Sequence, residues 1–194
     1  RSLNLMGLEW ANRGINLWLV EEGSVTLVTD TATYTLPSYT IDLLEHTLRT
    51  DSGTTNQTDT ALYRMSVSTY SQITNKLTKG KPTQIYINRL RDAPTITVWP
   101  TPSSTYNGDF VRYFRLRRIE DTGAKSSNNA DIPARFLPCM VAGLAYHIAM
   151  KRPEAAQRIQ LLKSVYDEQF ELAAQEDREK ASYSFTPQMD YYSL

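Results

Sequence analysis

The stretch that decides the fold runs from Asp131 to Lys180 and reads DIPARFLPCMVAGLAYHIAMKRPEAAQRIQLLKSVYDEQFELAAQEDREK. Apolar residues in its first part recur one, three and four positions apart, the spacing of an amphipathic α-helix. The residues that share this spacing are Phe136, Leu137, Met140, Val141, Leu144, Ala145, Ile148 and Ala149. Asp131 is placed to cap the helix, and Pro133 suits its first turn because the missing amide proton does no harm there.

Pro153 predicts a break, because proline disfavours helical geometry at the preceding residue and cannot donate a hydrogen bond. A second helix is expected from about Glu154 to Lys180, ~40 Å long at 1.5 Å per residue. Its apolar seam consists of Ala155, Ile159, Leu162, Tyr166, Phe170 and Ala173. Acidic residues crowd its far end: Asp167, Glu168, Glu171, Glu176, Asp177 and Glu179. We therefore expect part of this helix to reach another chain.

The chain before residue 131 begins with a helical pattern and then changes to strands. Residues 3–18 carry two apolar stripes with helical spacing, whereas the period falls to two after residue 23. Strands are expected at 25–27 and 34–36, which should pair with each other, and at 41–49, 61–65, 84–90, 95–99 and 109–119. The turn Asp92-Ala93-Pro94 predicts a hairpin, and Ser68 is expected to cap one short helix. The polar runs 50–60 and 123–130 are expected to be loops.

The C-terminal segment 182–194 has no period but is rich in aromatic residues. These residues are Tyr183, Phe185, Tyr191 and Tyr192. Solvated disordered tails are poor in aromatics, so the composition predicts an extended arm that docks on a partner.

Composition and motifs predict no catalytic, cofactor-binding or metal-binding residues. The 21 basic and 21 acidic residues balance, so no overall field attracts nucleic acid or an anionic membrane. Cys139 stands alone and is expected in the core, and no apolar run is long enough to span a membrane. His46 and His147 lack partners at metal-ligand spacing. No two glycines lie within five positions of each other, which excludes phosphate-binding glycine loops.

Basic and aromatic residues alternate in the last expected strand, which carries Arg112, Arg115, Arg117 and Arg118. Such alternation occurs in proteins that bind single-stranded nucleic acid, but it also occurs at ion-paired sheet edges. We favour the second interpretation and expect these arginines to meet acidic residues of the long helix. The contact is expected within one subunit or across an interface between subunits.

Several segments together resemble the head-to-tail adaptor proteins of short-tailed bacteriophages, the connector proteins also called tail tubular protein A. The segments are TNKLTKGKPTQIYINRL (74–90), ITVWPTP (96–102), ADIPARF (130–136), AGLAYHIAMK (142–151) and YDEQFELAAQEDREKAS (166–182). The resemblance implies an α+β fold in which a helical bundle is joined to a small antiparallel β-sandwich or barrel. We therefore expect a helical domain from 1–18 and 131–181, a β-rich domain at 19–130, and the arm at 182–194.

The resemblance also implies a structural virion protein with no enzymatic activity. Such proteins assemble as a ring, usually of twelve copies, between the portal protein and the tail nozzle protein, and leave a channel for double-stranded DNA. The location would be the virion, with the host cytoplasm during assembly. The interface residues we expect are the four arginines, Asp167, Glu168, Glu171, Glu176, Asp177 and the four aromatic residues of the arm. Two alternatives are a carbohydrate-binding tail module, with Trp99 and Tyr106 as a platform, and a cell-wall hydrolase.

Overall fold

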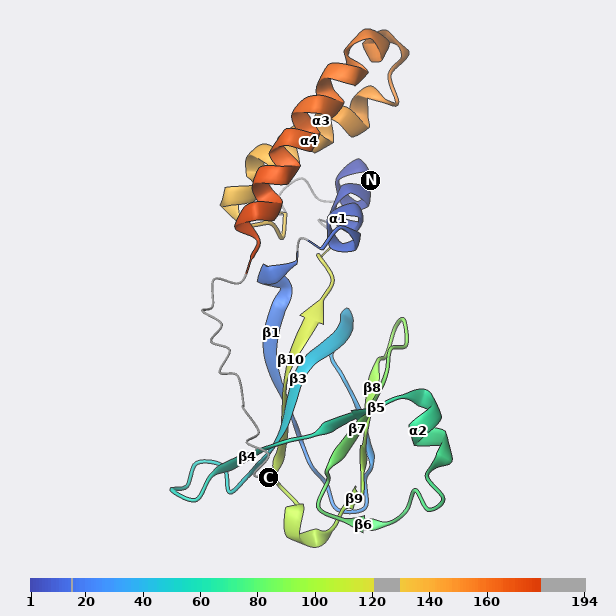
Figure 1. The fold of residues 1–194 in the computed structure, drawn as a ribbon, viewed down its shortest axis with the longest axis vertical. Coiled ribbons are helices and arrows are strands. Elements are labelled where there is room, and N and C mark those ends of the chain that lie inside the picture. The colour runs from blue at the N-terminus through green and yellow to red at the C-terminus, as the bar shows by residue number, and fades with distance from the viewer. Residues whose placement is uncertain (15, 121–129, 179–194) are drawn as a thin grey trace, which may run out of the picture.

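The computed structural model describes residues 1–14, 16–120 and 130–178. The helices α1, α3 and α4 gather at one end of the molecule, and the strands lie at the other end together with α2, with β1 and β10 leading from one end to the other (Figure 1). The α-helices are α1 (Ser2–Asn12), α2 (Val67–Gln72), α3 (Leu137–Ala149) and α4 (Ile159–Glu176). The 3₁₀ helices are η1 (Leu17–Leu19), η2 (Ser104–Tyr106), η3 (Ala134–Phe136) and η4 (Pro153–Arg158). The chain is thus of mixed α and β structure.

The strands form two four-stranded sheets and a small parallel pair. The first sheet has the order β1-β10-β3-β4, all antiparallel, and the second the order β2-β8-β7-β5, in which β5 and β7 are parallel. The strands of these sheets are β1 (Val20–Thr26), β2 (Thr33–Thr35), β3 (Thr40–Thr50), β4 (Thr58–Ala61), β5 (Tyr63–Met65), β7 (Gln84–Asn88), β8 (Thr95–Trp99) and β10 (Phe110–Arg117). The small pair is β6 (Lys79–Gly80) with β9 (Thr101–Pro102).

Alternating side chains of both sheets fill one shared core. Buried residues of the first sheet include Leu43, Leu48 and Val111, and those of the second include Ile85 and Ile96. The period-two pattern therefore predicted β7 and β8 correctly, and these strands pair antiparallel as the expected hairpin. The strand expected at 41–49 is also confirmed as part of β3.

The predicted pairing of 25–27 with 34–36 is wrong. β1 pairs with β10 in one sheet, whereas β2 pairs with β8 in the other. Leu27 leaves the first sheet with its amide bonded to the Asp109 carbonyl at 2.7 Å. The Tyr34 hydroxyl then donates to the Thr31 carbonyl at 2.7 Å and accepts from the Val28 amide at 3.0 Å. These bonds hold the segment as a corner between sheets.

Two helix starts differ from the sequence prediction. The short helix α2 is capped by Ser66 and not by Ser68, because the Ser66 hydroxyl accepts from the Thr69 amide at 3.0 Å. Asp131 does not cap α3, which begins at Leu137 after the turn η3. The Asp131 carboxylate is instead bonded to Arg117 and to the Glu120 amide.

The N-terminal helix is shorter than the predicted 3–18. It ends at Asn12, and Gly14 follows with a φ of 87°, a left-handed conformation that glycine adopts readily. The chain then turns through η1 into β1.

The break at Pro153 is confirmed, since α3 ends at Ala149 and a new helical segment starts at Pro153. That segment is 3₁₀ up to Arg158, so α4 has 18 residues and spans about 27 Å instead of the expected ~40 Å. It ends at Glu176, where Asp177 turns toward the start of η1.

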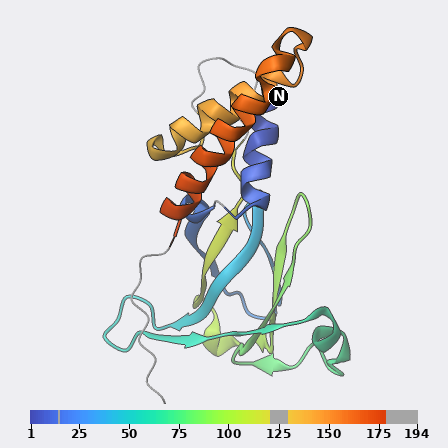
Figure 2. The ribbon, with the colours of Figure 1, turned by 45° about the horizontal axis from the view of Figure 1, so that its top comes forward.

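A second core lies among α1, α3 and α4, which pack together in Figures 1 and 2. Its fully buried aromatic rings are Trp10 and Phe136, and the Trp10 indole donates to the Tyr166 hydroxyl at 3.0 Å. Gly143 permits this close packing, because a Cβ there would lie 2.7 Å from the Met6 sulfur and from the Tyr166 ring.

The predicted apolar seams of α3 and α4 are only partly buried. Tyr166, Phe170 and Ala173 lie in the core as expected. Ala155, Ile159, Leu162 and Leu144 are half-buried. Three residues of the α3 pattern, Leu137, Val141 and Ile148, are exposed. The reason is that α1 and α4 cover only one side of α3, the side of Cys139 and Gly143.

Candidate partner-binding surfaces

The three arginines of β10 form salt bridges with the neighbouring strand β1, whereas Arg118 follows the end of β10. Antiparallel pairing places Arg115 opposite Glu21, and the two side chains meet at 2.7 Å. Arg117 reaches the same Glu21 at 2.5 Å, and Arg112 is bonded to Glu22. The predicted contact with acidic residues of the long helix is therefore wrong within one chain, because β1 lies closer. A contact between two copies stays a prediction.

Arg117 also joins the sheets to the helices. Its guanidinium bonds both oxygens of Asp131, one of them at 3.0 Å, and only 13% of its side chain is exposed. These hydrogen bonds lower the pKa of Asp131 and Glu21 below their ordinary values and raise that of Arg117. The Trp18 indole donates to the Asp131 carbonyl at 3.1 Å. The joint is thus built from charged, hydrogen-bonded groups that favour one arrangement.

Asp177 makes a second joint between the helices and β1. Its carboxylate accepts from the Asn16 amide at 2.6 Å and from the Leu17 amide at 3.1 Å. The sequence interpretation placed Asp177 at a partner interface. In the structure the residue has an intramolecular role, since it holds the end of α4 against the turn before β1.

Arg118 lies in a different environment from the other three arginines. Within the described ranges it forms no salt bridge, and its guanidinium carbon is 4.1 Å from the centre of the Tyr39 ring. Tyr39 has a φ of 66°, uncommon for a large side chain. The pair borders an open depression of about 530 Å³ that Arg89 and Arg91 also line, and these two arginines form salt bridges with Asp42 and Asp92. Such a surface suits an acidic group of a partner.

The acidic residues predicted for the interface lie on the exposed surface of α4. Asp167, Glu168, Glu171 and Glu176 are all exposed. The first three form no salt bridge with any residue that the structure describes. They are therefore available to basic groups of another molecule. The predicted arm, with Tyr183, Phe185, Tyr191 and Tyr192, lies outside the described residues, as do Glu179 and most of the expected loop 123–130.

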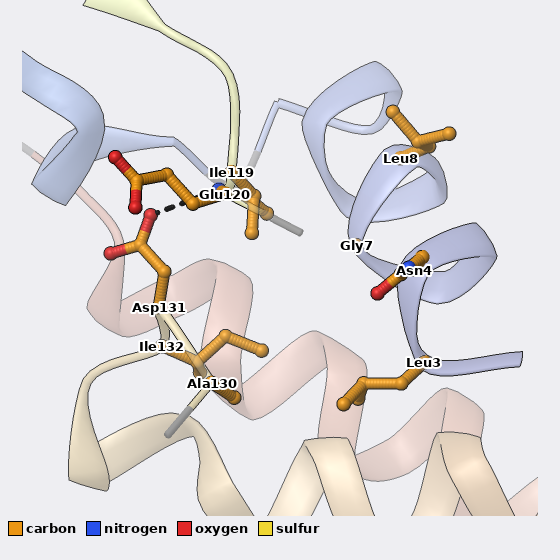
Figure 3. Close-up of a pocket in the computed structure, with 9 residues that line it drawn as sticks. All are labelled: Leu3, Asn4, Gly7, Leu8, Ile119, Glu120, Ala130, Asp131 and Ile132. Carbon is orange, nitrogen blue, oxygen red and sulfur yellow. Dashed lines mark hydrogen bonds between the residues drawn. The ribbon is translucent and has the colours of Figure 1, made fainter. Parts of the chain in front are cut away.

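An apolar seam runs between α1 and the end of β10, where Leu3 and Gly7 face Ile119 and Ile132 (Figure 3). Its free volume is only about 30 Å³, which is the space of about one water molecule. The seam is therefore a packing contact between the helices and the sheet, and it is too small for an organic ligand.

Neither the two histidines nor the cysteine belongs to a metal-binding group among the described residues. Among the described residues, no group of three or more His, Cys, Asp or Glu side chains could hold a metal ion. His147 is bonded to Glu9 at 3.1 Å. Cys139 is buried, and burial raises its pKa to about 11, which disfavours the reactive thiolate. No helix in the described part of the chain is both long and apolar enough to cross a bilayer.

Comparison with known proteins identifies the family to which this chain belongs. The family model described as SU10 adaptor protein matches residues 1–189. The chain belongs to this adaptor family. No curated protein matches it. The resemblance noted in the sequence is thereby confirmed, and this adaptor is a structural component of a phage particle.

Proposed function

We propose that this adaptor forms a ring that joins the portal protein to the tail nozzle protein and encloses part of the DNA channel. The observation that carries the proposal is the family match over residues 1–189. Twelve copies, assembly in the host cytoplasm and passage of double-stranded DNA belong to the same proposal. The balanced net charge supports a passive channel, because a neutral chain does not hold the DNA backbone strongly.

The two polar contacts between the helices and the strands support a role in holding neighbouring proteins at a fixed position relative to each other. Arg117 with Asp131, and Asp177 with the Asn16 amide, tie the helices to β1 and β10 from two sides. A connector must hold its two ends in a defined relation, and charged hydrogen bonds that are partly shielded from water favour one geometry.

We also propose that residues 182–194 form an arm that docks on the portal or on an adjacent copy. Each aromatic side chain can bury ~150–250 Å² on a partner. Asp167, Glu168 and Glu171 on α4 and the depression beside Arg118 are further candidate contacts, because these three carboxylates and Arg118 form no salt bridge in the described part of the chain.

Electron microscopy of the purified chain, alone and mixed with the portal of the same phage, tests the proposal. We expect closed rings seated on one end of the portal particle. A chain that leaves the portal unchanged at high concentration, and that joins no portal–nozzle assembly, would contradict it.

A further inference from the structure

The outer side of α3 is an apolar surface that nothing in the described structure covers. The helix Leu137–Ala149 contains no Asp, Glu, Lys or Arg. Its exposed residues Leu137, Val141 and Ile148 are separated by four and seven positions, which aligns them on one side. Val141 is 63% exposed. A helix that is apolar on all sides is normally covered on all sides, so this surface indicates a partner.

A matching apolar stripe lies on α4. Leu161, Val165 and Leu172 are exposed and have the same separations of four and seven. Separations of this kind form the seam along which two helices interlock. α3 and α4 lie side by side (Figures 1 and 2). Leu172, the last residue of the α4 stripe, lines a depression together with Pro138 of α3.

The outer side of α3 and the exposed stripe of α4 cannot cover each other within one chain. α3 and α4 already contact each other through their buried sides, with Cys139 and Gly143 on α3 and Tyr166 and Phe170 on α4. Within residues 1–14, 16–120 and 130–178, both exposed stripes therefore lack a covering element.

Charge indicates that the other molecule is a second copy of this chain. Residues 132–153, which include α3, hold Arg135, Lys151 and Arg152 and no acidic residue. α4 holds one lysine and four acidic residues, of which Asp167, Glu168 and Glu171 form no salt bridge in the described part of the chain. The basic residues that flank α3 in one copy are therefore opposite in charge to the acidic residues of α4 in another, and the exposed apolar residues of the two helices have matching separations. With zero net charge, two copies do not repel each other.

We propose that the outer side of α3 in one copy packs against the Leu161–Val165–Leu172 stripe of α4 in a second copy. The inference rests on the proposed function, to which it assigns the surface between neighbouring subunits. Every copy carries both halves of the contact, so the pairing can continue from copy to copy until a ring closes.

Cysteine cross-linking between two variants tests the contact. Val141→Cys protein is mixed with Leu161→Cys, Val165→Cys or Leu172→Cys protein under mild oxidation, alone and with portal particles. The native Cys139 is buried and does not compete. We expect a cross-linked dimer in high yield for at least one pair. The control is Gln160→Cys, an exposed position of α4 away from the stripe, which should give several-fold less. Equal yields with the control, or no cross-link in either sample, would overturn the inference.

A charged variant separates this inference from the proposed function. Val141→Lys places a charge on an exposed position, so the melting temperature should stay unchanged. Light scattering after size-exclusion chromatography should show loss of the oligomer, while Gln160→Lys assembles normally. If Val141→Lys forms normal rings on the portal, the inference fails and the adaptor function stands. If the unaltered chain neither self-associates nor binds the portal, both fail.

Discussion

At the scale of single residues, a few long-range polar contacts define how the helices meet the sheets. Arg117 and Asp131 are 14 positions apart, and Asn16 and Asp177 are 161 apart. Neither pair could be predicted from spacing, because a carboxylate in a sequence gives no information on which distant amide or guanidinium it will meet. The sequence therefore suggested a helix cap for Asp131 and a partner contact for Asp177, and both residues turn out to stabilise the fold.

Replacing Arg117 by alanine should destabilise the chain by about 1–3 kcal/mol at neutral pH, since two carboxylates lose a charged donor. The bonds lower the pKa of Glu21 and Asp131, so their contribution is full above the ordinary values of 4.5 and 3.8 and is lost as the pH falls below them. Urea unfolding across this range should show the two proteins converging in acid. The control is Arg89→Ala, which removes an exposed salt bridge and should cost only ~0–1 kcal/mol.

His46 should make the free energy of unfolding depend on pH at values closer to neutral than Glu21 and Asp131 do. Its Nε2 atom is buried and has no hydrogen-bond partner in the described structure. Burial, and then the nearby Arg64, lower its pKa below the ordinary 6.5, although Glu45 and Asp42 act in the opposite direction. As the pH falls, His46 therefore takes up a proton in the unfolded chain before it does so in the folded chain. The free energy of unfolding decreases as the pH drops below about 6.5.

We expect His46→Phe to remove this part of the pH dependence, while His46 protein loses stability between about pH 7.5 and about pH 5.5. The free energy of unfolding in urea, measured at both pH values, checks the difference. The same loss in both proteins would show that His46 is not its source.

At the scale of elements, periodicity predicted which segments are regular but not what each one packs against. The period of two correctly indicated β7 and β8, the branched and aliphatic residues of 41–49 indicated β3, and the helical period indicated α3 and α4. Alternation alone does not select a partner strand, which is why β1 and β2 were assigned to one hairpin although they belong to different sheets. The sequence predicts an apolar stripe along α3, of which the structure buries only part. The informative signal is the absence of any charged residue in the helix, which is the basis for proposing a second covered side.

Replacing glycine by alanine should have opposite effects on the free energy of unfolding at two positions in helices. In α3, a Cβ at Gly143 would lie 2.7 Å from the Met6 sulfur and from a Tyr166 ring carbon, so Gly143→Ala should cost about 1–3 kcal/mol. In α1, the nearest atom to a Cβ at Gly7 is 3.6 Å away, an ordinary contact, so Gly7→Ala should gain about 0.5–1 kcal/mol. Thermal unfolding of both variants gives the comparison. A stabilised Gly143→Ala protein would refute the close packing of α1, α3 and α4.

At the scale of the whole molecule, the helices and the sheets have separate cores, joined by β1 and β10 and by the two polar joints. A chain built in this way can present one surface to its neighbours in a ring and others to the proteins above and below. The ring and the partners that we propose rest on family membership, because spacing and composition in this sequence do not specify them.

Removing residues 182–194 should separate folding from assembly. If this segment is a docking arm, the truncated protein keeps its circular dichroism spectrum and melting temperature, because its aromatic side chains bury their area only on a partner. Binding to the portal, measured by co-sedimentation, should be lost or strongly reduced. A truncated protein that melts earlier while assembling normally would show that the segment belongs to the fold instead.

The central claim is that this adaptor forms the ring between portal and tail nozzle. Cryo-electron microscopy of the neck of the phage that encodes it tests this most directly. The account predicts a ring of density between portal and nozzle into which the structure fits, with α3 of each copy against α4 of the next. A neck in which portal and nozzle meet directly, or in which that density belongs to another protein, would contradict it.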